Sequence, residues 1–467
     1  MNTKIVSAGN GKRRMETGDH FKNGASSKSL TSRGKFFRKA CFALLASGIV
    51  FWSCNKPEEN QSRFAKIDMK DAALLFIAPS NSTTRSATKS STEQNRLFKI
   101  TDDGIVEEVS YLDEDGNEIN ESYMPEMIYH ISNSDYFVVT IRRPYDGSFT
   151  GYSSNNYLVR KSDGAVFLLP AFLYGRTGGY VNSDFLIQDA NKNIYFMCRM
   201  LGEMLRVYKV DISDPNNLTL SPITPDTEDA YAFTVSAKGD ILYSINQSWE
   251  YRLRKSNGGL YNIPHGRFWG LDSWTGFDGK IKYVTSDASL EDWTTHLYSI
   301  NISENGDVSI DDKKLDFQDF IFNDNAYLIR FSNRVLLIGR SSSAGFVAIH
   351  EVENVSNSPR IVNLSYGIST VKNVVSSDNY YYLRGNNSSA QPFLIKVNPA
   401  NDAVTELFSA GAYDIYAMAV SANDELTFNA LRMNDGRKVI GKITSSGALQ
   451  IIDDQMDVEV TVLQRIQ

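Results

Sequence analysis

Two of the five histidines, His265 and His296, fall in polar stretches rich in aromatic residues. An imidazole in such a place, beside a tyrosine, an arginine or a carboxylate, could act as a general acid or base. His130 and His350 instead stand inside apolar, strand-like runs, where a structural role is expected. The sequence contains no HExxH, P-loop, GxSxG or CxxC motif. These residue types therefore favour ligand binding over catalysis.

Aromatic residues gather near the same stretches. Flat rings beside Asp, Asn and Arg suit the CH faces and hydroxyls of sugars, and they suit peptides nearly as well. The alternative for each tryptophan is that it packs over its own loop as a cap. The predicted ligand-binding residues are Trp249, Trp293, Trp269, His265, Arg267, Tyr145 and Tyr152.

Metal and cofactor chemistry finds little support in the sequence. Cys41 and Cys54 belong to the basic and apolar N-terminal segment and its end, which leaves Cys198 alone, so neither a disulfide framework nor a cysteine metal cluster can form. The apolar neighbours of Cys198 predict a core position. The acidic run from Asp113 to Glu118 lacks the distal glutamate of a calcium loop, which favours an acidic turn. No metal and no cofactor are predicted.

The elements that must position these residues are repeated strands. An apolar strand, a tight polar turn and a second apolar strand recur at 231–244, 374–382 and 415–428, with looser copies elsewhere. A third strand and an Asx-Gly turn recur at 97–104, 158–164 and 253–258. Such turns need positive φ and mark hairpins between alternating runs.

The period of roughly 45–50 residues is the length of a four-stranded propeller blade. Seven units begin near residues 125, 180, 229, 268, 319, 370 and 413. Residues 71–109 supply three further strands and residues 458–466 supply one, so we predict an all-β propeller of eight four-stranded blades. The C-terminal strand pairs with the first blade and removes the open edges. Seven blades is the alternative.

The predicted connectors differ between the two faces of the ring. The first–second and third–fourth turns of each blade are short, whereas the second–third loops and the links between blades are long. The long set includes residues 80–95, 144–155, 286–296 and 385–391. Long loops on a rigid scaffold commonly carry binding. The long-loop face is therefore the predicted binding face.

Charge is distributed unevenly along the chain. The net charge of −7 combines about +8 over residues 1–53 with about −15 from Cys54 onward. An acidic protein lacks the clustered cations that phosphate backbones require, so nucleic acid is not a predicted partner.

Residues 33–39 are basic, residues 40–52 are apolar but too short to span a membrane, and Ser53-Cys54 follows. This arrangement resembles a lipoprotein signal peptide, which implies cleavage before Cys54 and acylation of that cysteine. Asn55-Lys56-Pro57-Glu58-Glu59 resembles the tag of surface lipoproteins of Bacteroidetes, and the whole chain resembles their uncharacterised propeller lipoproteins. The resemblance implies a lipid anchor in the outer membrane, on the cell surface or facing the periplasm. The expected organisation is a leader over 1–53, a polar tether over 54–65 and a propeller over 66–467.

Three functions remain open. The first is a binding lipoprotein that recognises a glycan or a protein through the long-loop face. The second is a glycan lyase or hydrolase that uses His265 or His296 with carboxylates. The third is a structural subunit of an outer-membrane assembly.

Overall fold

In a computed structural model, the chain divides into two units, residues 1–60 and 61–467, and the described residues all belong to the second unit. The structure describes residues 64–79, 95–119, 123–131, 134–142, 154–169, 174–175, 186–189, 191–199, 204–214, 218–245, 250–263, 272–286, 295–303, 305–315, 320–321, 327–341, 347–454, 459–460 and 463–465.

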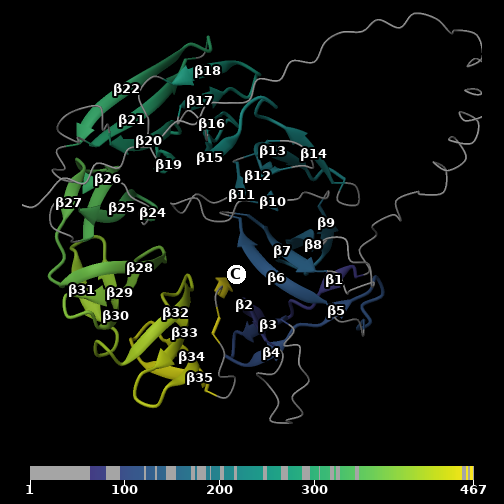
Figure 1. The fold of residues 1–467 in the computed structure, drawn as a ribbon, viewed down its shortest axis with the longest axis vertical. Helices are drawn as coiled ribbons and strands as arrows, with labels where there is room; N and C mark the ends of the chain where they lie inside the picture. Colours follow the sequence, from purple (N-terminus) through teal and green to yellow (C-terminus); the bar gives the residue numbers. More distant parts are fainter. Residues whose placement is uncertain are drawn as a thin grey trace, which may run out of the picture. The chain divides into compact units, whose positions relative to one another are not determined.

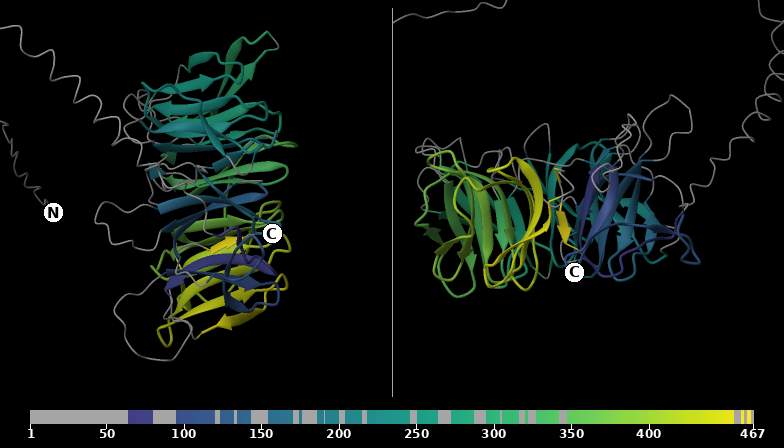
Figure 2. Two further views of the ribbon diagram at one scale, coloured as in Figure 1. Left: turned by 90° about the vertical axis from the view of Figure 1, so that its right-hand side faces the viewer. Right: turned by 90° about the horizontal axis from the view of Figure 1, so that it is seen from below.

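The described residues form strands and no helix, and the strands build eight antiparallel blades in a ring (Figure 1). Each blade runs from an inner to an outer strand, and edge-on views show the strands passing between the two faces of the ring (Figure 2). The prediction of eight blades is confirmed, and the alternative of seven is wrong. In blades 2 and 5 the inner strand is divided into two short pieces that pair with the same neighbour.

The blades are named in chain order, and their strands are given from the inner to the outer edge. Blade 1 contains β6 (Met124–His130), β7 (Tyr136–Arg142), β8 (Ser154–Arg160) and β9 (Val166–Leu168). Blade 2 contains β10 (Tyr174–Gly175), β11 (Leu186–Gln188), β12 (Ile194–Arg199), β13 (Arg206–Asp211) and β14 (Thr219–Pro222). Blade 3 contains β15 (Ala230–Val235), β16 (Ile241–Ile245), β17 (Tyr251–Arg254) and β18 (Leu260–Ile263). Blade 4 contains β19 (Asp272–Thr275), β20 (Ile281–Ser286), β21 (Thr295–Ile302) and β22 (Val308–Leu315).

The remaining blades follow the same plan. Blade 5 contains β23 (Phe320–Ile321), β24 (Tyr327–Arg330), β25 (Arg334–Ser341), β26 (Val347–Asn354) and β27 (Arg360–Val362). Blade 6 contains β28 (Ile368–Ser376), β29 (Tyr381–Asn387), β30 (Pro392–Asn398) and β31 (Ala403–Glu406). Blade 7 contains β32 (Tyr413–Val420), β33 (Leu426–Arg432), β34 (Arg437–Ile443) and β35 (Leu449–Asp453). The closing blade contains β36 (Leu463–Arg465), β2 (Ala72–Pro79), β3 (Asn95–Thr101) and β4 (Val106–Glu108).

The ring closes through the last strand, as predicted. β36 lies beside β2, with Leu463 opposite Phe76 and Arg465 opposite Leu74 (Figure 1). The two ends of the repeat therefore share one sheet, and the backbone groups of an inner edge are paired.

Each pair of neighbouring blades encloses its own hydrophobic cluster, so eight clusters fill the eight junctions. In β2, Leu75 faces blade 1 while Leu74 and Phe76 face blade 7. Successive strand residues point to opposite faces, and both faces of every blade are covered. This is why second strands such as β7, β12 and β25 contain nearly continuous apolar runs. Cys198 lies fully buried in the cluster between blades 1 and 2, which confirms its predicted core position.

A short ribbon joins the closing blade to blade 1. In it β1 (Lys66–Ile67) pairs with β5 (Tyr111–Leu112), and the β1 segment also bonds to blade 1 through Ile67 N and Gly164 O at 2.9 Å. The Phe64 ring is buried against Tyr111 and Tyr123. Phe64 therefore belongs to the hydrophobic cluster between the closing blade and blade 1.

Candidate functional site

Antiparallel strands place the connectors of every blade on two faces. The short-turn face carries the connectors between first and second strands and between third and fourth strands. Its side chains close the turns themselves. Asp189 Oδ1 accepts hydrogen bonds from the N–H groups of Asn191 and Asn193 at 2.8 and 2.9 Å, and Ser236 Oγ accepts from the N–H of Asp240 at 3.0 Å. Such capping holds short polar turns without help from a ligand.

The long-loop face carries the other connectors, and it differs around the ring. The connector between β2 and β3 runs from 80 to 94, that between β7 and β8 from 143 to 153, and that between β20 and β21 from 287 to 294. In blades 6 and 7 the equivalent connectors span only 388–391 and 433–436. The longest of these connectors thus belong to the closing blade and to blades 1 and 4, whereas those of blades 3 and 5 span only 246–250 and 342–346.

One predicted loop is wrong. The run from 385 to 391 was expected to be irregular, but β29 continues through Asn387 and a tight turn follows, in which Asn387 Oδ1 accepts hydrogen bonds from the N–H groups of Ser389 and Gln391. Gly385 permits the continuation, because a Cβ there would lie 1.8 Å from the Thr370 carbonyl oxygen. A glycine required by close strand packing resembles a loop glycine in the sequence.

All the predicted ligand-binding residues lie outside the described residues, and so does the lipidation residue Cys54. They are Trp249, Trp293, Trp269, His265, Arg267, Tyr145 and Tyr152. The structure does describe the strand ends that bracket five of them. Ile245 and Tyr251 bracket the connector with Trp249, Ile263 and Asp272 bracket the link with His265, Arg267 and Trp269, and Ser286 and Thr295 bracket the connector with Trp293. All six strand ends lie at the long-loop face of blades 3 and 4.

His296 is the predicted catalytic candidate that the structure describes, and it is not in a loop. It is the second residue of β21, opposite Lys314 of the long strand β22. The polar Thr-Thr-His sequence resembles a loop, but pairing with β22 extends the strand through it. The His296 ring nitrogen Nδ1 lies 2.7 Å from Asp312 Oδ1. A carboxylate in this position orients an imidazole.

The His296 ring is the outermost member of an aromatic row between blades 3 and 4. It stacks on Tyr298 with ring centroids 5.8 Å apart, Tyr298 stacks on Tyr283 at 4.9 Å, and Tyr283 meets the edge of Tyr251 at 5.5 Å. The three tyrosines are almost fully buried. Burial raises the pKa of Tyr283 far above its usual value, and the neighbouring Tyr298, Tyr251 and Asp312 raise it further. The row therefore forms a neutral, rigid support beneath an imidazole–carboxylate pair.

A second polar group lies at the same face between blades 2 and 3, and the sequence analysis missed it. The Tyr243 hydroxyl donates to Glu228 Oε2 at 2.5 Å, and Arg252 Nε lies 3.7 Å from Glu228 Oε1. Burial raises the pKa of Tyr243, as does its hydrogen bond to Glu228. Glu228 stands in a link between blades and carries no local motif, so only the folded ring brings it to Tyr243.

The short-turn face carries a hollow that the sequence analysis also missed. A cavity of about 1100 Å³ lies between the closing blade and blade 1, bordered by the β1 segment and by the turns of blade 1. Charged side chains supply much of its wall. No motif marks it, because its residues come from five separate parts of the chain.

Metal ligands do not cluster within the part of the chain that the structure describes, where no group of three or more His, Cys, Asp or Glu side chains could hold an ion. The acidic run at Asp113 forms the predicted turn, in which Asp113 Oδ1 accepts the N–H of Asn117 at 2.8 Å. Among the described residues there is also no helix with the length and hydropathy needed to cross a membrane.

His130 and His350 lie in strands β6 and β26, as predicted. His350 is almost fully buried, and burial lowers its pKa to about 4. It therefore stays neutral in the folded protein at ordinary pH, which agrees with a structural role.

No protein-family model matches the chain, and no curated protein matches it. Several solved structures are similar in fold. Virginiamycin B lyase from Staphylococcus aureus is 14% identical with a TM-score of 0.36, over 59% of this chain and 84% of that one. Dipeptidyl peptidase 4 from Porphyromonas gingivalis is 10% identical with a TM-score of 0.47, over 70% of this chain and 52% of that one. A puromycin-hydrolyzing peptidase from Mycobacterium tuberculosis is 14% identical with a TM-score of 0.42, over 71% of this chain and 53% of that one. The propeller assignment itself rests on the strand pairing of this chain, whose eight blades close through β36 and β2.

Proposed function

We propose that this chain is an outer-membrane lipoprotein, anchored through Cys54, whose ring binds a glycan or a protein through the long-loop face. The observation that carries the proposal is the unequal division of connectors between the two faces. Short turns capped by their own side chains make up one face, while the longest connectors between second and third strands lie on the other, on the closing blade and on blades 1 and 4. Variable loops on a rigid support are the usual site of recognition.

Blades 3 and 4 are the proposed centre of recognition. The connectors with Trp249 and Trp293 and the link with His265, Arg267 and Trp269 all leave from strand ends of these two blades. Beneath them lies the buried row of Tyr251, Tyr283 and Tyr298. Tyr145 and Tyr152 belong to the connector of blade 1 and are proposed as a peripheral part of the same face.

Ligand binding by the detergent-solubilised full chain tests this proposal. A glycan array and a pull-down from outer-membrane extract would provide the ligand, and a Trp249→Ala, Trp293→Ala double variant should then bind at least about tenfold more weakly. Tyr261→Ala, which removes an exposed aromatic ring from the outer strand β18, is the matched control and should bind normally. Unchanged binding by the double variant would contradict the face assignment.

The anchor and its orientation have their own test. Labelled fatty acid should be incorporated into the wild-type protein and not into Cys54→Ser. Protease added to intact cells distinguishes surface display from the periplasmic side. Co-purification with a membrane partner in fixed ratio, without ligand binding, would support a structural subunit instead.

A specific observation favours a second candidate, a glycan lyase or hydrolase. His296 is held by Asp312 at 2.7 Å at the long-loop face, which is the arrangement of an oriented proton-transfer group. Turnover on a panel of polysaccharides that disappears in His296→Ala and falls in Asp312→Asn would establish catalysis. Binding without turnover by the wild-type protein would exclude it for that ligand.

A further inference from the structure

The hollow on the short-turn face has a structural cause. At this junction the segment that contains β1 is inserted between the closing blade and blade 1. Ile67 N bonds to Gly164 O at 2.9 Å, and Lys99 Nζ bonds to Asp68 Oδ2 at 2.9 Å and to Lys70 O at 3.0 Å. The inserted segment holds the two sets of turns apart. The cavity of about 1100 Å³ is large enough for a small oligosaccharide.

A repeated motif places a lysine at this cavity. Arg-Lys-Ser-Asp-Gly at 160–164 in blade 1 corresponds to Arg-Lys-Ser-Asn-Gly at 254–258 in blade 3. In blade 3 the turn closes with Gly258 N bonded to Lys255 O, and in blade 1 it closes one residue wider, with Gly164 N bonded to Arg160 O. Lys161 is therefore an extra residue in the turn of blade 1.

The two lysines consequently meet different surroundings. Lys255 Nζ donates to the Gly306 carbonyl of blade 4 at 2.6 Å and joins two blades. Lys161 lines the cavity, and its backbone is fixed there by a bond from its N–H to Asp135 O at 2.8 Å. Within the described part of the chain, the ion pairs do not include Lys161.

The groups around Lys161 favour an anionic ligand for its ammonium group. Burial lowers the pKa of Lys161, Asp135 raises it and Arg465 lowers it. A half-buried ammonium group is stabilised by one close anion. The neighbouring Arg160 is already bound to Asp163 by two hydrogen bonds of 2.9 and 2.7 Å. Lys161 is thus a cation of the cavity wall that forms no ion pair within the described part of the chain.

The rest of the wall limits the ligand. Five carboxylates and three cationic side chains line the cavity, so an anion of high charge such as a polyphosphate would be repelled. Carboxylates at Asp71, Asp102 and Asp135 and the hydroxyl of Ser162 can accept hydrogen bonds from sugar hydroxyls, and Tyr136 offers a half-exposed ring. The wall suits one negative charge surrounded by many hydroxyl donors.

We propose that this cavity binds a saccharide that carries a single carboxylate, a uronic acid, with the carboxylate on Lys161 and the hydroxyls on the surrounding Asp and Ser side chains. The site lies on the face opposite the proposed recognition loops. It is independent of their ligand and of the lipid anchor.

Ligand-observed NMR and calorimetry on the full chain test the proposal. The probe is an aldobiouronic acid, a disaccharide of one uronate and one neutral sugar, and its methyl ester is the uncharged equivalent. The wild-type protein should bind the acid in a saturable way and should bind the ester at least about tenfold more weakly. Lys161→Met should weaken binding of the acid by a similar factor.

Lys238→Met is the matched control, because Lys238 is an exposed lysine in a turn of the same face. It should leave affinity within about twofold, and the long-loop variant Trp249→Ala, Trp293→Ala should do the same. Absence of saturable binding to the acid, equal affinity for acid and ester, or unchanged affinity in Lys161→Met would each overturn the proposal. Loss of acid binding in the tryptophan variant would show that the uronate binds at the long-loop face. That result would overturn the proposal as well.

Discussion

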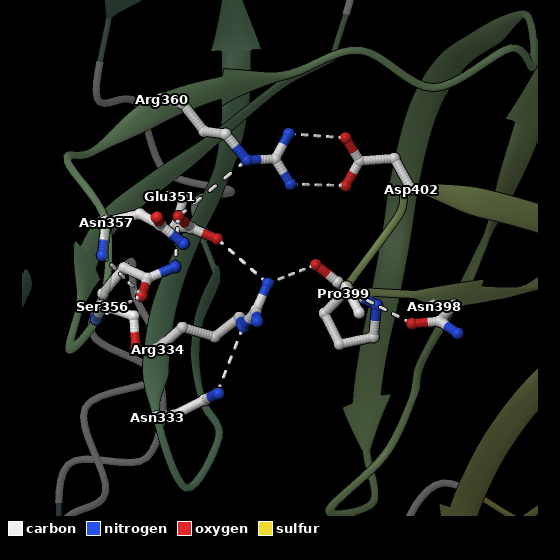
Figure 3. Close-up of polar contacts among 11 residues, drawn as sticks. Asn333, Arg334, Glu351, Ser356, Asn357, Arg360, Asn398, Pro399 and Asp402 are labelled. Atoms are coloured by element: carbon white, nitrogen blue, oxygen red, sulfur yellow. Dashed lines mark hydrogen bonds and ion pairs between the residues drawn. The ribbon is translucent and has the colours of Figure 1, made fainter.

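The junction between blades 5 and 6 and the junction between the closing blade and blade 1 differ in how charged groups fill them. Between blades 5 and 6, Glu351 is fully buried and lies 3.3 Å from Arg334 Nη1, and Arg334 also donates to the Pro399 carbonyl (Figure 3). Arg360 reaches across to Asp402 with two parallel hydrogen bonds of 2.6 and 2.9 Å (Figure 3). Here blade meets blade directly, and these four charged groups satisfy one another.

At the other junction the blades meet through an inserted segment. Asp68 and Lys70 of that segment bond to Lys99, and a cavity remains beside them. The same kind of ring thus contains a junction whose charges are internally satisfied and a junction with a charged wall open to a ligand. The difference indicates that polar residues between blades serve stability where turns touch, and become available for binding where a segment separates them.

The largest expected effect on stability comes from removing the buried carboxylate of the junction between blades 5 and 6. Glu351→Ala leaves Arg334 and Arg360 without their buried carboxylate, and we expect a loss of about 3–5 kcal/mol in the free energy of unfolding. Urea denaturation measures it. Asp435→Ala, which removes the partner of Arg432 at the surface, should cost much less, because solvent screens an exposed pair. Equal effects of the two substitutions would contradict the distinction between buried and exposed pairs.

A substitution at Gly164 should displace the inserted β1 segment from its contact with blade 1. Gly164 has a φ of +69°, and a Cβ there would lie 2.0 Å from Ile67 O. We expect Gly164→Ala to cost at least about 3 kcal/mol, because it combines left-handed strain with a clash against β1. Gly279→Ala is the control, since its φ is +75° and a Cβ would meet nothing within 4 Å. It should cost about 1–2 kcal/mol, and an equal cost at both glycines would show that the contact with β1 is unimportant.

The stability of the folded ring should also depend on pH through the buried His350. His350 has a pKa of about 4 in the folded protein, against an ordinary value of 6.5, so the unfolded chain binds more protons between these values. Stability should therefore fall as the pH drops from about 6.5 to about 4, by up to about 3 kcal/mol from this group. His350→Leu should remove that part of the slope in denaturation curves measured at several pH values. A variant with the wild-type slope would exclude His350 as its source.

The smallest expected effect is the difference in stability loss between substitutions of the two lysines of the repeated motif, Lys255 and Lys161. Lys255→Met loses the hydrogen bond to Gly306 and should cost about 2 kcal/mol in the free energy of unfolding. Lys161→Met removes a half-buried charge that has no ion pair within the described residues, and it should change stability by less than about 0.5 kcal/mol. Thermal or urea denaturation of the pair measures the difference. A large loss in Lys161→Met would indicate a structural lysine and not a binding group.

Sequence reasoning identified the blades because their signals are local. Asx-Gly turns and alternating strands such as 231–244 and 415–428 repeat the same pattern. The C-terminal run was predicted to pair with the incomplete set of strands at 71–109, which is the closing blade. It misplaced His296 and the run at 385–391, because polar or glycine-containing strands resemble loops until a partner strand extends them. It found His296 and missed its contact with Asp312, since that contact depends on the register between β21 and β22.

The sequence by itself determined the class of fold and favoured eight blades over seven in a closed ring, because period-two alternation and turn chemistry act over a few residues and recur along the chain. Only the tertiary structure decided which charged residues are satisfied and which face a cavity. Lys161 and Lys255 share one motif, and their surroundings differ because the β1 segment lies against Gly164 while blade 4 reaches Lys255. Contacts between residues so far apart in the chain leave no local pattern from which they could be inferred.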